Sequence, residues 1–170
     1  RKGMKRVVII GACGSGKTTL GQAMSGKLGI AWTDLDDLFW LPGWKRRPFE
    51  EFEGMVKQTV AADTWIVCGN YSKLQHLTVF QADTVVWLDL SLGILLWRII
   101  KRGVIQARQR TAICNGNYQS ISQFWWLFKH LFKSFWKKKT RYKQLEAQAT
   151  QATWVHLRDI DALNKWLAAI

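Results

Sequence analysis

The segment from Gly11 to Thr18, which reads GACGSGKT, has the residue types and spacing of a phosphate-binding loop. It matches the pattern GxxxxGK followed by Ser or Thr at every required position. The glycines allow successive backbone N–H groups to point at phosphate oxygens, and a following helix adds its positive N-terminal end. In such a loop Lys17 reaches the β- and γ-phosphates, and the Thr18 hydroxyl ligates Mg²⁺. We therefore expect nucleotide contacts from Gly11, Ala12, Cys13, Gly14, Ser15, Gly16, Lys17, Thr18 and Thr19.

The sequence around this loop favours a true phosphate site over an accidental match. A run rich in Val and Ile precedes it, as a buried strand would, and a helical segment follows it directly. The motif alone does not separate a kinase from a GTPase, a motor or another transferase.

Two carboxylates follow the second predicted strand. Asp34 and Asp36 are two residues apart, so on an extended segment both face the same way, into the crevice where ligands bind on parallel sheets. They can hold Mg²⁺ through water or accept a substrate proton. The alternative is that they cap a helix that begins just before Leu38.

Polar residues also follow the third predicted strand, where the chain reads Gly69-Asn70-Tyr71. Glycine permits close approach of the backbone to a ligand, while Asn70 and Tyr71 offer hydrogen bonds and a stacking ring. A plain turn with a capping Asn is the alternative.

Arg98 and Arg102 are four residues apart on a predicted helix and share a face. Two guanidinium groups on one face suit a polyphosphate chain or the charge that develops on a transferring phosphoryl group. Further candidates are Arg108, Arg110 and Arg141. The alternative is a solvated basic face.

The remaining pattern predicts an α/β fold in which a parallel sheet is covered by helices on both faces. Strands are expected at 5–10, 31–33, 64–68, 84–90 and 153–157, and helices at 17–28, 48–62, 92–108, 124–148 and from Asp159 to about 170. We expect loops at 34–45, with a Pro42-Gly43 turn, and at 111–122, and a loop with a short helix at 69–81.

Length and composition fit one domain, which we place at 4–170, with 1–3 as a cloning remnant or an extension before Met4. The formal charge of +13 favours anionic partners such as nucleotides, nucleic acid or a membrane surface. The three cysteines form no CxxC pair, and no apolar run is long enough for a membrane span or a secretion signal. A cytoplasmic location is therefore expected.

The helix at 124–136 has a wide apolar face. Phe124, Leu127, Phe128, Leu131, Phe132 and Phe135 form a helical stripe, and Lys129, Lys133 and Lys137 mark the opposite face. We expect the stripe to pack on the sheet or on the helix that carries Leu95, Trp97 and Ile100. A homodimer interface and a membrane surface are the alternatives.

Taken together, the chain resembles the adenylate-kinase-like P-loop kinases and, more closely, the family of DNA topology modulation proteins. The matching text is IIGACGSGKTTL, DLDDLFWLPGW, WIVCGNYS, QADTVVWLDL and LWRIIKR. The resemblance implies a three-layer P-loop sandwich with a five-stranded parallel sheet of order 2-3-1-4-5, ATP with Mg²⁺ at the phosphate loop, and a lid around 103–140. It also implies that Arg98 lies against the adenine and Arg102 against the phosphates. Its acceptor pocket corresponds to Asp36, Trp40, Gly69, Asn70 and Tyr71, next to Asp34.

These observations lead to a phosphotransferase as the first functional hypothesis. It would move the γ-phosphoryl group of ATP·Mg²⁺ to a small acceptor, such as a nucleoside monophosphate, with Lys17, Arg102, Asp36 and Arg141 as catalytic residues and Thr18 and Asp36 as metal ligands. The alternatives are a nucleic-acid-associated ATPase that uses the basic lid region and a membrane-associated nucleotide switch that uses 124–136.

Overall fold

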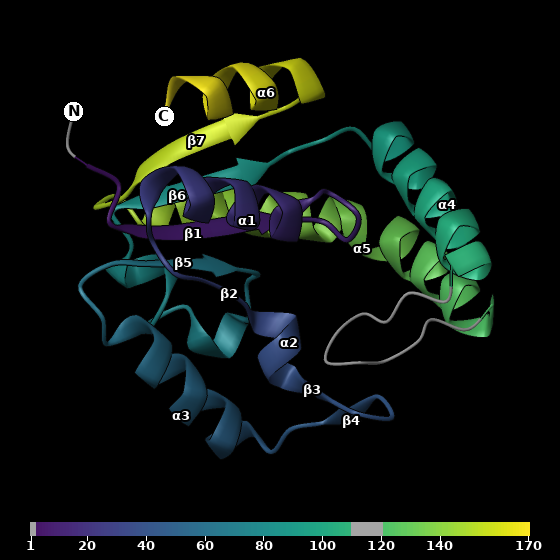
Figure 1. Cartoon of the computed structure of the whole chain (residues 1–170), viewed down its shortest axis with the longest axis horizontal. Coiled ribbons are helices and arrows are strands. Elements are labelled where there is room, and N and C mark those ends of the chain that lie inside the picture. The colour runs from purple at the N-terminus through teal and green to yellow at the C-terminus, as the bar shows by residue number, and fades with distance from the viewer. Residues whose placement is uncertain (1–2, 110–120) are drawn as a thin grey trace.

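The structure, a computed structural model, describes residues 3–109 and 121–170. Within two helices it describes only the backbone at residues 102–104, 106–109, 121–128 and 130. The described chain is a parallel sheet of five strands with helices on both sides (Figure 1).

The sheet is built around β1 (Arg6–Gly11), which pairs in parallel with β5 (Trp65–Cys68) on one side and β6 (Thr84–Leu88) on the other. Two further parallel strands, β2 (Trp32–Asp34) and β7 (Thr153–Leu157), form the edges. The four apolar residues of β1 from Val7 to Ile10 are all 0% exposed, as expected for a strand covered on both faces.

The order of this sheet is β2-β5-β1-β6-β7. The strand numbers differ from the expected 2-3-1-4-5 because two short strands that the sequence did not predict, β3 (Trp40–Leu41) and β4 (Lys45–Arg46), take the numbers in between. They form a separate antiparallel hairpin around the Pro42-Gly43 turn.

Each face of the sheet has its own apolar core. On one face, Leu20 and Met24 of α1 (Lys17–Leu28) share a cluster with Leu163 and Trp166 of α6 (Ile160–Ala169). On the other face, α3 (Phe49–Val60) and α5 (Ile121–Gln148) contribute their buried side chains. These are Phe52, Val56, Tyr142 and Leu145.

The helix ends follow the expected chemistry. Gly29 adopts a left-handed φ of 67° directly after α1, and its N–H donates to the Ser25 carbonyl at 2.9 Å. Glu50 and Glu51 lie in the first turn of α3, where their charges complement the positive end of the helix. Asp159 caps α6 by accepting a hydrogen bond from the Ala162 N–H at 2.7 Å.

Several expected boundaries were wrong. The expected loop at 34–45 contains the helix α2 (Leu35–Phe39) as well as the β3–β4 hairpin. The segment 69–81 contains two short 3-10 helices, η1 (Ser72–Leu74) and η2 (Val79–Gln81), and β6 ends at Leu88 rather than at residue 90. Helix α5 begins at Ile121, whereas most of the loop expected at 111–122 lies outside the described residues.

Helix α4 (Leu92–Gln109) and α5 lie side by side at one end of the molecule (Figure 1). Their shared core contains Leu95, Ile99, Leu131 and Phe135. The aromatic stripe predicted for 124–136 is therefore partly wrong, because Phe132 is 55% exposed, and Trp97 and Ile100 of α4 also face outward. The side chains at 124–128 lie outside the described residues. Across residues 3–109 and 121–170, no helix combines the length and the apolar composition that crossing a membrane requires.

Candidate functional site

The phosphate loop connects β1 to α1 and is shaped by two glycines with left-handed backbone angles. Gly14 has a φ of 78° and Gly16 a φ of 91°, a region that L side chains rarely adopt. A Cβ on Gly14 would lie 2.9 Å from Ile99 Cγ1, and one on Gly16 would lie 3.2 Å from Arg98 Nη2. The loop thus requires glycine both for its conformation and for its packing against α4.

Lys17 is the first residue of α1, and its ammonium group lies over the loop. Its Nζ donates hydrogen bonds to the carbonyl oxygens of Gly11 at 3.3 Å and Ala12 at 3.1 Å. Among the described residues, no side chain caps the N-terminus of α1, and its first turn has no acidic residue. The positive partial charge of this helix end is therefore available to bind an anion.

The Thr18 hydroxyl is joined to the end of β2. It donates a hydrogen bond of 2.6 Å to Asp34 Oδ2, while Asp34 Oδ1 accepts from the Asp36 N–H at 3.0 Å and so caps α2. Burial raises the pKa of Asp34 above its ordinary value; the charge of Asp36 adds to this, and the hydrogen bond from Thr18 opposes it. A hydroxyl and a carboxylate in contact form an oxygen donor pair of the kind that holds Mg²⁺.

Asp36 faces a different partner, contrary to the prediction from an extended segment. It lies in the first turn of α2, and its Oδ1 accepts a hydrogen bond of 2.6 Å from the Tyr71 hydroxyl. The alternative that a carboxylate caps a helix was correct for Asp34, but the helix begins at Leu35 rather than just before Leu38. The two carboxylates are thus divided, one beside Thr18 and the other beside Tyr71.

The other predicted acceptor-site residues surround this Asp36–Tyr71 pair only in part. Trp40 packs edge-on against Phe39 at 5.0 Å, and Phe39 lies 5.1 Å from the Tyr71 ring, both measured between ring centroids. Gly69 has a φ of 112° and donates its N–H to the Ile9 carbonyl at 2.9 Å. Asn70 accepts a hydrogen bond from Gln75 Nε2 at 3.1 Å, which ties its side chain to its own loop.

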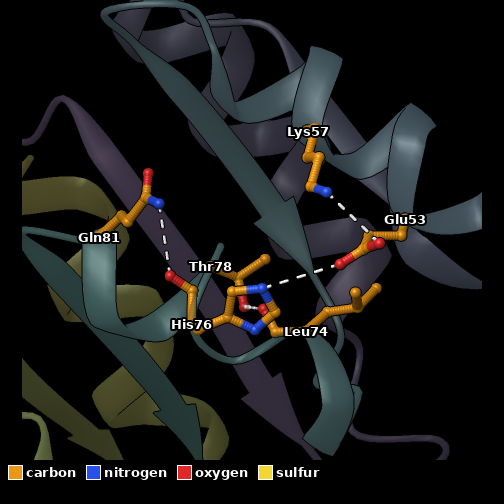
Figure 2. A network of polar contacts seen from close by, with 6 residues as sticks. All are labelled: Glu53, Lys57, Leu74, His76, Thr78 and Gln81. Carbon is orange, nitrogen blue, oxygen red and sulfur yellow. Dashed lines mark hydrogen bonds and ion pairs between the residues drawn. The ribbon is translucent and has the colours of Figure 1, made fainter.

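The segment that follows Tyr71 is held to α3 by the polar network in Figure 2. Glu53 of α3 lies 3.4 Å from Lys57 Nζ and 3.8 Å from His76 Nε2. The His76 carbonyl accepts from Gln81 Nε2 at 3.3 Å, and Thr78 Oγ1 donates to the Leu74 carbonyl at 3.1 Å. The Glu53–His76 pair joins this segment to α3, and the other contacts lie within α3 or within the segment itself.

Two of the predicted arginines contact loops of the site. Arg98 of α4 donates to the Ser15 carbonyl at 3.0 Å, so its guanidinium group lies on the phosphate loop. Arg141 of α5 donates to Ser72 Oγ at 3.1 Å. The side chains of Arg102 and Arg108 lie outside the described residues, as does Arg110 altogether, so their predicted roles stay predictions.

Lys138 is a residue that the sequence analysis missed. It belongs to the run Lys137-Lys138-Lys139 on α5, whose three members have different surroundings. Lys137 is exposed, and Lys139 Nζ pairs with Asp89 Oδ1 at 3.1 Å. Lys138 is partly buried, with Lys17, Cys13, Asp36 and Arg141 as its electrostatic neighbours. Only the phase of the buried stripe on α5 could have identified it.

A pocket of about 520 Å³ lies away from the phosphate loop, at the opposite end of the strands, and Lys5, Asp63, Asp83 and Gln151 are among its lining residues. Asp83 accepts hydrogen bonds from the backbone N–H groups of Lys5 and Arg6, at 3.0 and 2.8 Å, and from the Thr84 hydroxyl at 2.7 Å. Its carboxylate therefore joins the starts of the neighbouring strands β1 and β6.

The residues of the phosphate loop fit ATP and Mg²⁺. The two left-handed glycines give the loop a backbone path that residues with a Cβ rarely adopt, the N-terminus of α1 is free of side-chain caps from the described residues, and Thr18 with Asp34 supplies hard oxygen ligands. In addition, Ser15 Oγ is buried and has no hydrogen-bond partner among the described residues.

No protein-family model matches the chain, and no curated protein sequence does. Solved structures are similar to it over almost its whole length. Shikimate kinase from Acinetobacter baumannii, in complex with shikimate, has a TM-score of 0.54 at 13% identity, covering 98% of this chain and 90% of that one. Shikimate kinase from Bacteroides thetaiotaomicron gives 0.53 at 20% identity, covering 98% and 96%, respectively. A sugar kinase from Janibacter sp. gives 0.52 at 16% identity, covering 98% and 94%. The chain therefore has the α/β fold of the P-loop kinases, whereas the specific resemblance to DNA topology modulation proteins stays a prediction.

Proposed function

We propose that this protein is a P-loop phosphotransferase that moves the γ-phosphoryl group of ATP to a small acceptor bound beside Asp36. The observation that carries the proposal is the 2.6 Å contact between Thr18 and Asp34, one residue away from Lys17. This hydroxyl and carboxylate would serve as the Mg²⁺ ligands, next to a lysine that would bind phosphate. The kinase fold of the solved structures supports the same reaction class.

The donor side of the site is formed by α1, β2 and α4. Lys17 would exchange its hydrogen bonds with the loop carbonyls for phosphate oxygens, and Arg98 would add a second cation at Ser15. Thr18 and Asp34 would hold Mg²⁺, which supplies charge neutralisation on the phosphates when it is bound. Catalysis would then rest mainly on positioning and on charge neutralisation.

The acceptor side is formed by α2 and the loop after β5. For a hydroxyl acceptor, the new bond joins its oxygen to the γ-phosphorus, and the bond to the β–γ bridging oxygen breaks with its electron pair leaving on ADP. The hydroxyl proton would move to the Asp36 carboxylate, which the Tyr71 hydroxyl holds at 2.6 Å. Asp36 thus serves as the general base, and Asp34 as the metal-side carboxylate.

The test is transfer of labelled γ-phosphate from ATP·Mg²⁺ to a panel of nucleoside monophosphates, shikimate and related hydroxy acids, and sugars. The control is Lys17→Ala, which keeps the fold but removes the phosphate contact. We expect transfer to one acceptor class, lost in the variant. ATP binding without transfer to any acceptor, together with hydrolysis stimulated by DNA, would instead support the nucleic-acid-associated ATPase.

A further inference from the structure

The buried face of α5 contains one charged residue in an otherwise apolar stripe. Leu131, Phe135, Tyr142 and Leu145 of α5, and Ala149 directly after it, are each at most 7% exposed. They are spaced by four or three residues, except for a gap of seven between Phe135 and Tyr142. Lys138 fills that gap in phase, three residues after Phe135 and four before Tyr142, so it lies on the same face of the helix.

The residues one turn before and one turn after Lys138 show where it lies relative to the phosphate loop. Phe135 belongs to the apolar cluster that contains Ala12 of the phosphate loop, and Tyr142 packs on Trp87 of β6, with ring centroids 5.7 Å apart. Lys138 is one turn from each of them and so faces the phosphate loop, and its electrostatic neighbours include Cys13 and Lys17 of that loop as well as Asp36.

The same helix is joined to the acceptor side of the site by Arg141. Its guanidinium group donates to Ser72 Oγ at 3.1 Å, and Ser72 directly follows Tyr71, the partner of Asp36. Lys138 and Arg141 are three residues apart and therefore adjacent on the helix surface. Arg141 of α5 thus lies on the acceptor side, and Lys138 lies between it and the phosphate loop, whereas Arg98 lies at Ser15 on the donor side.

We propose that Lys138 is an acceptor-binding residue and that the acceptor is an anion, with a phosphate or carboxylate group held between Lys138 and Arg141. This inference rests on the proposed phosphotransferase function and narrows its acceptor class. Nucleoside monophosphates and hydroxy acids meet the requirement, whereas neutral sugars do not.

The electrostatics of the group support this assignment. Burial lowers the pKa of Lys138 from its ordinary value, and the charge of Lys17 lowers it further, whereas Cys13 and Asp36 oppose the shift. An anionic ligand beside the amine would favour the ammonium form and would offset the cost of placing it next to Lys17. Lys139 contrasts with it, because its charge is already paired with Asp89.

The experiment measures anion binding after the donor site has been filled. The protein is saturated with a non-hydrolysable ATP analogue and Mg²⁺, and inorganic phosphate or malonate is titrated by calorimetry, with glycerol as a neutral comparison. The variants are Lys138→Met, Lys138→Arg and Lys137→Met, the last of which changes an exposed lysine of the same run.

We expect saturable binding of at least one of the two anions to the wild type, and unchanged binding to Lys137→Met. Lys138→Met should bind it roughly tenfold to a hundredfold more weakly, the loss typical of one hydrogen bond to a charged group, and Lys138→Arg should retain most of the affinity. No saturable anion binding to the wild-type complex, or equal binding by Lys138→Met, would overturn the proposal. So would a loss of analogue affinity in Lys138→Met as large as that in Lys17→Ala, since Lys138 would then belong to the donor site. Failure of the phosphotransferase proposal is seen separately in the transfer assay, as ATP binding without transfer of the γ-phosphate to any acceptor.

Discussion

The Thr18 hydroxyl donates its hydrogen bond to Asp34 across 2.6 Å and thereby joins the first turn of α1 to the last residue of β2. The same carboxylate caps α2, whose first turn contains Asp36. One side chain thus joins the proposed donor side of the site to the proposed acceptor side, and each of its two oxygens contacts one of them.

Asp34→Asn should make the protein more stable at neutral pH and should weaken its binding of Mg²⁺. The folded-state pKa of Asp34 is raised, mainly by burial, so its contribution to stability is fully present below the ordinary value of 3.8 and is lost as the pH rises through the folded pKa. Asparagine keeps a capping oxygen and removes the charge that causes this loss.

The melting temperature of Asp34→Asn should therefore exceed that of the wild type at pH 7, and the difference should disappear as the pH falls to the ordinary Asp value. The concentration of Mg²⁺ that supports half-maximal binding of an ATP analogue should rise about tenfold or more. Equal melting temperatures at both pH values would contradict the electrostatic part of this prediction.

Tyr71→Phe should lower kcat/KM for the acceptor without changing the affinity for the ATP analogue. The ring is held by Phe39 and Phe52, at centroid distances of 5.1 and 5.0 Å, so its packing survives the change. The hydrogen bond to Asp36 is lost, which costs about 1.5–3 kcal/mol for a charged acceptor. We expect kcat/KM for the acceptor to fall roughly tenfold or more, with an unchanged Kd for the ATP analogue. A parallel loss of analogue affinity would show that the pair serves the donor site instead.

Gly16→Ala should destabilise the protein by about 1–2 kcal/mol, because its φ of 91° is unfavourable for any residue with a Cβ. The new methyl group would also lie 3.2 Å from the Arg98 guanidinium. The matched control is Gly26→Ala in the helix that follows, where a Cβ meets nothing within 4 Å and should stabilise the helix by about 0.5–1 kcal/mol. Urea unfolding should give opposite signs for the two variants, and only Gly16→Ala should reduce binding of the ATP analogue.

The thiols of Cys13 and Cys68 should respond differently to alkylation of the native protein. Burial raises the pKa of Cys68 to about 12, so almost no thiolate forms near neutral pH, and its side chain is 0% exposed. Cys13 is partly exposed in the phosphate loop. Mass mapping after iodoacetamide treatment should find Cys13 modified and Cys68 modified only in urea. The ATP analogue with Mg²⁺ should protect Cys13, and labelling of Cys13 at the same rate with and without it would argue against the nucleotide site.

The sequence was sufficient for the sheet and the phosphate loop because both depend on local patterns. A strand that is buried on both faces requires apolar residues, as in β1, and the left-handed backbone angles of the loop require glycine. Both requirements can be recognised from the residue types alone. The β3–β4 hairpin was not predictable in the same way, since each of its strands has only two residues and no periodicity can be read from them.

Asp34 and Asp36 have different hydrogen-bond partners because of where α2 begins, and a helix boundary is the least certain feature of any sequence-based prediction. An extended backbone at Leu35 would turn the two carboxylates the same way, whereas the helical backbone gives them different partners, and both conformations are compatible with the sequence DLDDLF. Phe132 was misplaced for a related reason. Nine of the thirteen residues from Phe124 to Trp136 are apolar, so composition did not show which of them face the core.

The position of Lys138 makes the length of α5 as important as its composition. Each residue of an α-helix turns the chain by about 100°, so one residue inserted between Lys139 and Tyr142 would turn Lys138 out of the stripe while the apolar residues after it stayed in place. A lysine would still stand nearby, but it would be Lys139, now taken from its ion pair with Asp89. Between Phe135 and Tyr142 the number of residues therefore matters as much as their identity.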